Sequence, residues 1–338
     1  MNYKSHLLSQ ARTPLQDVIP LDTPFTILLE LSRICNLKCR FCPQSDKNSF
    51  CMFDKKFLHI KEIEKIIDQV KAFPNKLKKI YLHGTGESTL NSELAQIVAF
   101  IKESGVTEQI DLTTNGVLLT EELGKQLVEN GINHIHISLE ALSDEDYNEI
   151  TQTNKNYYSV VFKNIKNFYR IRGNCRLSVK IASVSLKSED DKTKFLQTFS
   201  PYCDEIFVEN IFPIWPLFKL PYVVKEDGVG QYGQAVVEKK VCPQIFTTLA
   251  IKSDLTVSAC SMDYNNTLAL GNLNQETLYE VWNGERLREL RNSHLQRGRN
   301  EVVLCRGCGL PKYSCIDNLD EYSHMITKKL NERVITSG

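Results

Sequence analysis

Strand-like and helix-like stretches alternate along the chain from about residue 25 to residue 210. The first strand-like run, FTILLEL, is apolar and follows Pro24. The helix-like stretches repeat apolar residues at the spacing of one helix face, as Ile63, Ile66 and Ile67 do. The expected strands are 25–31, 79–83, 109–113, 134–139, 177–184 and 205–209. The expected helices are 60–72, one beginning near Asn91, 121–129, 157–169 and 192–199.

Six such units predict a parallel sheet with right-handed crossovers, and hence an α/β fold. The sheet either stays open or curls toward a barrel. In both cases the functional loops lie at the carboxyl ends of the strands. We therefore expect the chemistry of this chain in the loops that follow its strands.

The pattern changes after residue 210. Pro213, Pro216, Pro221 and Gly228 interrupt the pattern over 211–230, while Trp215 and Phe218 indicate packed structure there. Next, 246–251 and 255–260 predict a β-hairpin, and 276–295 predicts one amphipathic helix. Gly271-Asn272 is typical of a turn. The sequence thus predicts an N-terminal extension (1–24), a large domain (25–225) and a smaller domain (226–338).

Composition excludes several classes of function. Lys+Arg and Asp+Glu both number 41, so the formal net charge is zero and argues against a nucleic-acid partner. The first residues contain no long apolar stretch of the secretory type, and no run approaches the ~18 apolar residues of a membrane span. We expect a cytoplasmic protein that acts on neither membranes nor nucleic acids.

Three cysteines stand together directly after the first expected strand, at Cys35, Cys39 and Cys42. A disulfide framework would leave one of them over, and a tetrahedral zinc site would need a fourth ligand. Three thiolates do suit a [4Fe–4S] cluster with one open iron. An open iron can bind a small molecule and pass an electron to it.

The later cysteines form a second group: Cys242, Cys260, Cys305, Cys308 and Cys315. Eleven cysteines are many for this chain, and in the cytosol a metal or redox role is commoner than disulfides. Four thiolates can saturate either a zinc ion or a [4Fe–4S] cluster. Two separate groups therefore predict two separate sites.

The Cys-x3-Cys-x2-Cys run has an aromatic residue before its last cysteine, and HGTGE, TTNG and SLE follow the next strands in order. This arrangement resembles the radical S-adenosylmethionine (SAM) enzymes over about residues 25–210. The resemblance implies a partial (βα)6 barrel whose open iron chelates the amino and carboxylate groups of SAM. It also implies reductive cleavage of SAM to a 5′-deoxyadenosyl radical, with electrons from a flavodoxin or ferredoxin.

The same resemblance assigns candidate SAM contacts. Glu87 matches the acidic residue of the family's Gly-Gly-Glu-Pro loop, which receives the ammonium of SAM. Thr85 and Ser88 depart from that pattern, so the backbone carbonyls of 84–86 are alternative acceptors. Asn115 with Gly116 also suits a plain turn, and Ser138 a plain strand residue. The implied cofactor-binding residues are Phe41, Gly84, Gly86, Glu87, Thr114, Asn115, Ser138 and, more weakly, Glu140 and Lys180.

The C-terminal region resembles the auxiliary extension called SPASM and its shorter form, the twitch domain. Five cysteines are too few for two fully ligated clusters, so we expect one auxiliary [4Fe–4S] cluster held by Cys242, Cys260, Cys305 and Cys308. Structural zinc is the alternative. The remaining Cys315 is either an inert thiol or a hydrogen-atom donor.

Asp263 is a candidate base, unless it only caps a turn. With Cys315 it completes the expected catalytic residues.

The expected function is oxidoreduction of a carbohydrate-like small molecule, by dehydrogenation or epimerisation. The single auxiliary cluster resembles that of aminocyclitol dehydrogenases. Only about 24 residues precede the first strand, which is too few for an independent leader-binding domain. A maturase that modifies a ribosomal peptide or a protein side chain is the alternative. A third possibility is an iron–sulfur electron carrier without catalysis.

Overall fold

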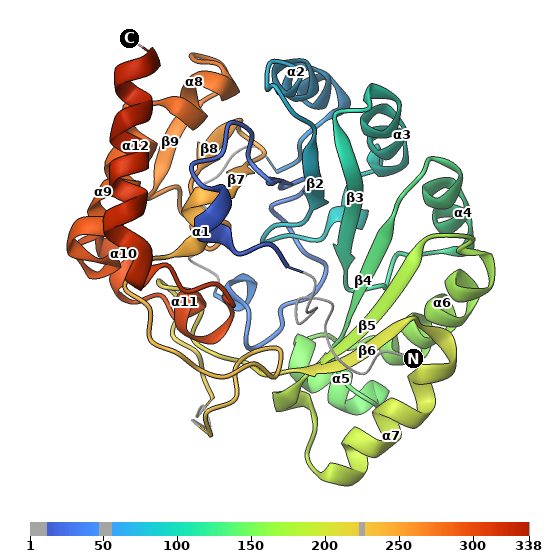
Figure 1. Ribbon diagram of the computed structural model, residues 1–338. Coiled ribbons are helices and arrows are strands. Elements are labelled where there is room, and N and C mark those ends of the chain that lie inside the picture. Colours follow the sequence, from blue (N-terminus) through green and yellow to red (C-terminus); the bar gives the residue numbers. More distant parts are fainter. Residues whose placement is uncertain (1–11, 47–55, 223–226, 338) are drawn as a thin grey trace.

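One sheet organises the protein. The computed structural model describes residues 12–46, 56–222 and 227–337. Nine strands form the sheet in the order β6-β5-β4-β3-β2-β1-β7-β8-β9. Figure 1 shows the sheet curving, with its helices on the outer side. Cys51 and residues 1–11 of the expected N-terminal extension lie outside the described residues.

The six expected parallel strands are confirmed. They are β1 (Thr26–Leu29), β2 (Leu77–Leu82), β3 (Thr107–Thr114), β4 (His134–Leu139), β5 (Arg176–Ala182) and β6 (Glu205–Glu209). Helices alternate with them: α2 (Ile60–Val70), α3 (Leu94–Ser104), α4 (Glu121–Glu129), α5 (Asp144–Thr151), α6 (Tyr157–Ile171) and α7 (Glu189–Phe199). The short α1 (Leu15–Val18) precedes them. The α/β prediction of a partial (βα)6 barrel is therefore right.

Alternation along the strands separates an apolar face from a polar one. In β4, Ile135 and Ile137 are fully buried in the core. His134, His136 and Ser138 occupy the alternate positions, which belong to the opposite, inner face of the curved sheet. The helices thus cover an apolar surface, while hydrogen-bonding side chains line the inside of the partial barrel.

The C-terminal region continues the same sheet. β7 (Thr248–Ile251) pairs in parallel with β1, so that Thr26 lies opposite Thr248 and Leu29 opposite Ile251. β8 (Thr256–Ser258) pairs antiparallel with β7, which confirms the predicted hairpin. One hydrophobic core extends through both regions. Main-chain pairing and a shared hydrophobic core therefore join the regions on the two sides of the boundary expected near residue 225.

Two C-terminal expectations are wrong. The helix predicted over 276–295 is two helices, α8 (Leu278–Asn283) and α9 (Glu285–Arg297), because Gly284 adopts an extended conformation. A Cβ on Gly284 would lie 2.6 Å from the Glu280 carbonyl oxygen. The turn predicted at Gly271-Asn272 belongs to a strand, β9 (Ala269–Asn272), which pairs with β8.

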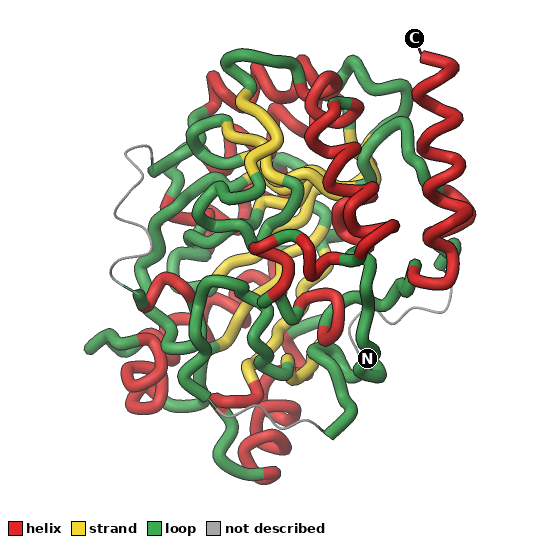
Figure 2. Tube along the Cα trace, turned by 90° about the vertical axis from the view of Figure 1, so that its left-hand side faces the viewer, coloured by secondary structure: helices red, strands yellow, loops and turns green. Residues whose placement is uncertain are grey.

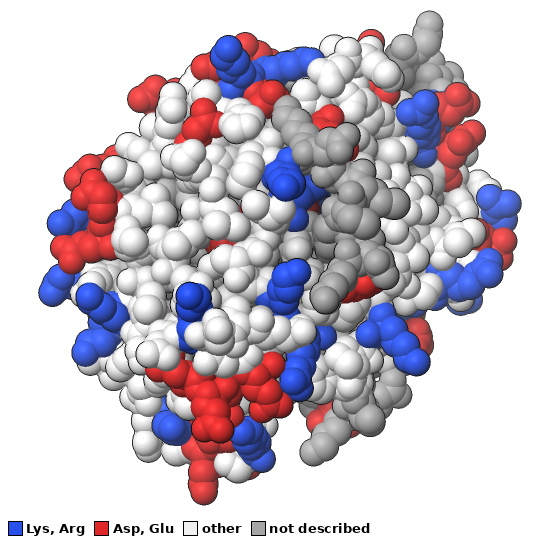
Figure 3. Space-filling model, turned by 180° about the vertical axis from the view of Figure 1, so that it is seen from behind, with Lys and Arg blue, Asp and Glu red and all other residues white. Residues whose placement is uncertain are grey.

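The remaining helices, α10 (Val303–Arg306), α11 (Leu310–Tyr313) and α12 (Ser323–Ser337), follow. Figure 2 shows α9 and α12 side by side at the C-terminal end. Acidic side chains begin both α5, at Asp144, and α7, at Glu189. These helices lie at the bottom of Figure 1, where Figure 3 shows acidic side chains gathered. Among the described residues, no helix combines the length and apolar character needed to cross a membrane.

Trp282 anchors α8. Its side chain is 1% exposed, its indole N–H donates to the Leu21 carbonyl oxygen at 3.1 Å, and the Arg291 guanidinium lies 4.3 Å from its ring. We expect Trp282→Ala to lower the free energy of unfolding by ~3–5 kcal/mol, because it leaves a cavity in the core. Trp282→Phe should lose much less. Thermal or denaturant unfolding of the three proteins measures the difference, and equal losses would contradict this packing role.

Candidate active site

The three N-terminal cysteines lie in one loop at the carboxyl end of β1. Cys42 N–H donates to the Cys39 carbonyl oxygen at 2.9 Å, and Leu37 N–H donates to Cys35 Sγ at 3.4 Å. The carboxyl end of α5 supports the loop, because its carbonyl oxygens at Ile150 and Thr151 accept from the loop's backbone. The expected three-thiol site is therefore held by short local bonds and by a neighbouring helix.

The thiols suit a cationic cluster. Burial raises the pKa of Cys35 far above its usual range, and the Glu87 carboxylate adds to the effect. Burial also raises the pKa of Cys42 to about 11. Cys39 has a raised pKa because of burial, Glu140 and the two other thiols. Iron is the kind of cation that would turn such buried thiols into thiolate ligands.

Glu87 connects the second strand's loop to the end of the third strand. Its Oε1 accepts from Thr89 N–H at 3.0 Å and from the Thr114 hydroxyl at 2.7 Å. Its Oε2 accepts from Asn115 N–H at 2.7 Å. The Asn115 side chain in turn donates to Asn36 Oδ1 at 2.8 Å in the cysteine loop. These bonds favour a positioning role for Glu87 and leave the backbone carbonyls of 84–86 as the better acceptors for an ammonium.

Gly86 is where this loop meets the cysteine loop. A Cβ there would lie 2.3 Å from the Ser32 carbonyl oxygen and 2.5 Å from that of Ile34. A Cβ on Gly84 would lie 2.6 Å from Glu30 Cγ. Both positions thus require glycine, Gly86 beside the backbone of the cysteine loop and Gly84 beside the Glu30 side chain, and their contact with SAM stays a prediction.

The other expected cofactor contacts are distributed around this centre. Phe41 and Ser138 are half-buried, the first against the core and the second at the inner face of β4. Lys180 Nζ forms an ion pair with both Glu209 oxygens, at 2.8 and 2.7 Å. Burial raises the pKa of Glu140, beside Cys39, to about 7. Lys180 is therefore committed to Glu209 and is a weaker candidate for a cofactor carboxylate.

Sequence reasoning missed three buried charges beside the cysteine loop. Glu30, which follows β1, pairs with Arg33 at 3.0 Å and with Lys252, after β7, at 3.8 Å. Their side chains are only 2%, 3% and 1% exposed. A glutamate at the end of an otherwise apolar strand was the available signal, because such a residue is rarely buried unless it is paired.

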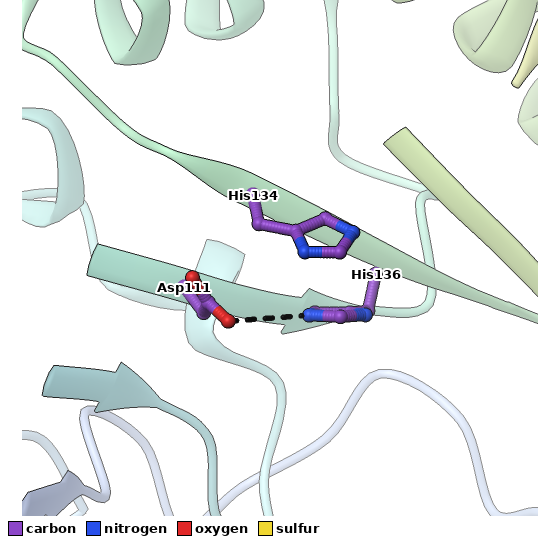
Figure 4. Close-up of side chains that lie close together, drawn as sticks. All are labelled: Asp111, His134 and His136. Atoms are coloured by element: carbon purple, nitrogen blue, oxygen red, sulfur yellow. Dashed lines mark ion pairs between the residues drawn. The ribbon is translucent and has the colours of Figure 1, made fainter. Parts of the chain in front are cut away.

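The inner face also carries a polar layer lower in the barrel. Asp111 on β3 faces His136 on β4 at 3.5 Å, and the His134 ring lies 3.8 Å from that of His136 (Figure 4). Burial would raise the pKa of Asp111, but His136 and Lys79 lower it to about 2. Burial, together with His136, lowers the pKa of His134 to about 3, so its ring is neutral. Lys79 pairs with Asp111 and supplies the positive charge that a metal ion would otherwise bring.

All five C-terminal cysteines gather at a second site. A hydrogen bond between Cys242 and Cys315 raises the pKa of Cys242, and the neighbouring Cys308 and Cys242 thiols add to the effect of burial at Cys260. Burial and the same neighbours raise the pKa of Cys305 to about 12. Like the first site, this group of buried thiols, several with raised pKa values, suits a metal centre. Cys315 belongs to the group.

Cationic side chains hold the backbone of this second thiol site. Arg299 donates to the carbonyl oxygens of Cys305 and Cys308 at 2.5 and 2.8 Å. Lys239 Nζ donates to that of Cys315 at 3.0 Å. The positive charges lie beside the loops that would carry thiolates.

Asp263 is fully buried in the turn between β8 and β9. Its carboxylate accepts from the Ser258 hydroxyl at 2.8 Å and from two backbone N–H groups, those of Thr267 at 2.7 Å and Leu268 at 2.8 Å. This geometry favours the turn-capping alternative for Asp263 over its predicted role as a base.

Two family models match the chain. The model of the radical SAM superfamily matches residues 29–195, and that of the SPASM iron–sulfur cluster-binding domain matches residues 242–309. The chain belongs to the radical SAM superfamily. It carries the expected SPASM-type domain at its C-terminal end. These families imply [4Fe–4S] clusters and SAM as cofactors, which fits both groups of buried thiols.

Curated relatives differ in what their names describe. A GTP 3′,8-cyclase of Clostridium perfringens is 33% identical over 124 residues, or 37% of each chain. The match thus spans little more than a third of that relative. The tungsten-containing aldehyde ferredoxin oxidoreductase cofactor-modifying protein of Pyrococcus furiosus is 24% identical and covers 86% of this chain and 90% of its own length.

Solved structures share the fold at low identity. Streptococcus suis SuiB bound to precursor peptide SuiA has a TM-score of 0.65 and 16% identity, covering 88% of this chain and 72% of its own. The anSMEcpe structure with bound AdoMet has a TM-score of 0.59, 16% identity and coverages of 93% and 95%. BtrN in complex with AdoMet and 2-DOIA has a TM-score of 0.53, 17% identity and coverages of 84% and 92%.

Gly86→Ala should weaken SAM binding strongly, because a Cβ pushes the loop away from the backbone of Ser32 and Ile34. Gly307→Ala is the matched control, since a Cβ there meets its nearest atom, the Pro216 carbonyl oxygen, at 3.4 Å. Anaerobic equilibrium dialysis of SAM against both reconstituted variants measures the effect. Equal SAM affinity in the two variants would show that the close approach is unimportant.

Iron counting tests the two thiol sites. Reconstituted wild type should hold about eight irons per chain, and Cys39→Ala and Cys260→Ala about four each. Cys315→Ala should keep about eight if the other four thiols ligate the auxiliary cluster. A fall to about four in Cys315→Ala would make Cys315 a ligand. If the wild-type protein contained zinc and only about four irons, the auxiliary site would be a zinc site and not an iron–sulfur cluster.

Proposed function

We propose that this radical SAM enzyme is an oxidoreductase that dehydrogenates or epimerises a carbohydrate-like small molecule. The observation that carries the proposal is the polar inner face of the barrel between the two thiol sites. Lys180 and Glu209 form an ion pair there, and Gln231 donates to Glu209 at 3.2 Å. Hydrogen-bonding side chains of this kind suit a substrate rich in hydroxyl groups.

The charge of Glu209 affects groups near both thiol sites. It acts on the pKa of Glu140, beside Cys39, and on that of Tyr232, which Cys315 also influences. Ser314, next to Cys315, contacts the Gln231 side chain that holds Glu209. A chain of hydrogen bonds therefore runs from Glu209 on the barrel wall to Ser314, the residue before Cys315.

The cofactors would supply the radical that removes a hydrogen atom from the substrate and a centre that takes up a second electron. Cys35, Cys39 and Cys42 would hold the first cluster, with Cys242, Cys260, Cys305 and Cys308 at the other. In a dehydrogenation, the carbinol carbon loses one hydrogen atom, one electron and the hydroxyl proton to give a carbonyl. In this proposal Glu209, which is paired with Lys180, accepts that proton.

A second candidate is a maturase that acts on another protein or on its cofactor. The Pyrococcus furiosus relative supports it, because that protein is named for modifying a cofactor and aligns along 86% of this chain. A peptide precursor, a partner enzyme or its cofactor would then occupy the barrel opening.

The deciding experiment is anaerobic reconstitution, reduction by dithionite and mass analysis with a panel of sugars and aminocyclitols in deuterated water. We expect 5′-deoxyadenosine together with a product. Loss of two hydrogens indicates dehydrogenation, and deuterium in an otherwise unchanged substrate indicates epimerisation. Cys39→Ala should abolish 5′-deoxyadenosine. Turnover of a precursor peptide or a partner's cofactor, with none of the panel, would replace the first candidate by the second.

Glu209→Gln should reduce product formation by at least about 100-fold, since general-base catalysis contributes about 10²–10⁴-fold. SAM cleavage without product should continue. Glu108→Gln is the control, because Glu108 is 51% exposed and pairs only with Lys78 at the outer surface. The ratio of product to 5′-deoxyadenosine is the readout, and an unchanged ratio in Glu209→Gln would exclude Glu209 as the base.

A further inference from the structure

Glu30, Arg33 and Lys252 form a buried charge cluster at the junction of the two family domains. Glu30 follows β1 and Lys252 follows β7, the neighbouring parallel strand. Arg33 extends the cluster further into the auxiliary side, where its Nη2 donates to Asn266 Oδ1 at 3.1 Å and lies 4.0 Å from Asp254 Oδ1. Two cations, one from the segment after β1 and one from the segment after β7, thus meet at the Glu30 carboxylate.

A buried carboxylate between two cations is strongly constrained. Burial would raise the pKa of Glu30, but Lys252, Arg33 and Thr85 hold it below the usual value, so the side chain is ionised. Removing one partner from such a group leaves an uncompensated charge inside the protein. The cluster therefore holds its members in one arrangement, and a shift of one member affects the others.

The fourth member of the cluster is Thr85, in the loop expected to receive SAM. Thr85 donates twice to Glu30 Oε1, from its N–H at 3.0 Å and from its hydroxyl at 2.5 Å. The neighbouring Gly84 packs directly on the Glu30 side chain. Gln44 joins the same place, since its amide donates to the carbonyl oxygens of Arg33 at 2.8 Å and Thr85 at 3.1 Å.

Thr85 is one of the two positions at which this loop departs from the Gly-Gly-Glu-Pro pattern. The structure gives that departure a physical reason, because a glycine at position 85 would lack the hydroxyl that donates to Glu30. The loop of this chain is therefore fixed by a side-chain contact to a residue that Lys252 and Arg33 also hold.

We propose that Glu30 is a positioning residue that couples the auxiliary hairpin to the SAM-binding loop, through Thr85 on one side and Lys252 with Arg33 on the other. The affinity for SAM then depends on residues of the auxiliary side that do not belong to the SAM-binding loop. This inference rests on the cofactor implied by the family and is independent of the substrate proposed above.

The first test compares Thr85→Val with Thr85→Ser in reconstituted full-length protein without substrate. Valine keeps the shape and removes the hydroxyl, whereas serine keeps the donor. We expect Thr85→Val to raise the Kd for SAM about tenfold or more, since a hydrogen bond to a charged group contributes at least that much. Thr85→Ser should stay within about twofold of wild type. Equal Kd values in Thr85→Val and wild type would overturn the proposal.

The second test acts from the auxiliary side. Lys252→Met removes a cation from Glu30, and the matched control Lys79→Met removes one from Asp111 on the same sheet. Lys252→Met should raise the Kd for SAM about tenfold, and Lys79→Met should leave it unchanged. SAM should also perturb the electron paramagnetic resonance signal of the reduced cluster less in Lys252→Met. A Kd that both variants change equally would show only general destabilisation.

A double variant, Thr85→Val with Lys252→Met, distinguishes coupling from two independent losses. If both residues act through Glu30, the double variant loses little more affinity than the weaker-binding single variant. Losses that multiply would show independent sites and contradict the coupling. Iron content and melting temperature confirm that each variant is folded, and binding measured without substrate keeps this test separate from the proposed reaction.

Discussion

Parallel pairing of β1 on both of its sides is the constraint on which the site depends. β2 lies on one side and β7 on the other, in register with the same four residues of β1. The carboxyl ends of all three strands therefore meet at one place. The cysteine loop, the loop of Gly84–Glu87 and the turn after Lys252 leave from that place, which explains why they contact one another.

Two buried carboxylates then organise these loops in different ways. Glu87 accepts hydrogen bonds from neutral donors of its own loop and of the end of β3. Glu30 is paired with Lys252, which follows β7, and with Arg33, which precedes the cysteines. Because both carboxylates are satisfied by the protein, the geometry around the cofactor is built before any ligand arrives, which is the arrangement that precise positioning requires.

Most of the barrel could be predicted from the sequence, and so could the two groups of cysteines; their role as metal ligands stays a prediction. Period-2 and period-3.6 patterns are local, and so are the spacings of Cys35, Cys39 and Cys42, so both can be recognised without a structure. The features that the sequence did not reveal depend on tertiary contacts. The helix breaks at Gly284 because this residue adopts an extended conformation close to the Glu280 carbonyl oxygen, and β9 forms because β8 offers it an edge.

The buried charges beside the cysteine loop show the same limit, because their partners are also set by tertiary contacts. Glu30 and Lys252 are separated by more than two hundred residues, and nothing in either local sequence predicts the other. Asp263 shows a related limit, because the sequence left its roles as a base and as a turn cap open, and the backbone N–H groups that occupy its carboxylate favour the cap. Only the partners of a carboxylate, which the fold decides, separate a base from a cap.

The pairing of β1 with β7 also bears on how the protein can be divided. A barrel cut away from the C-terminal region would expose the main-chain N–H and C=O groups of β1 along an apolar strand. Such an open edge invites pairing with other chains. The auxiliary region thus protects the β1 edge of the barrel sheet, and the two domains depend on each other to remain soluble.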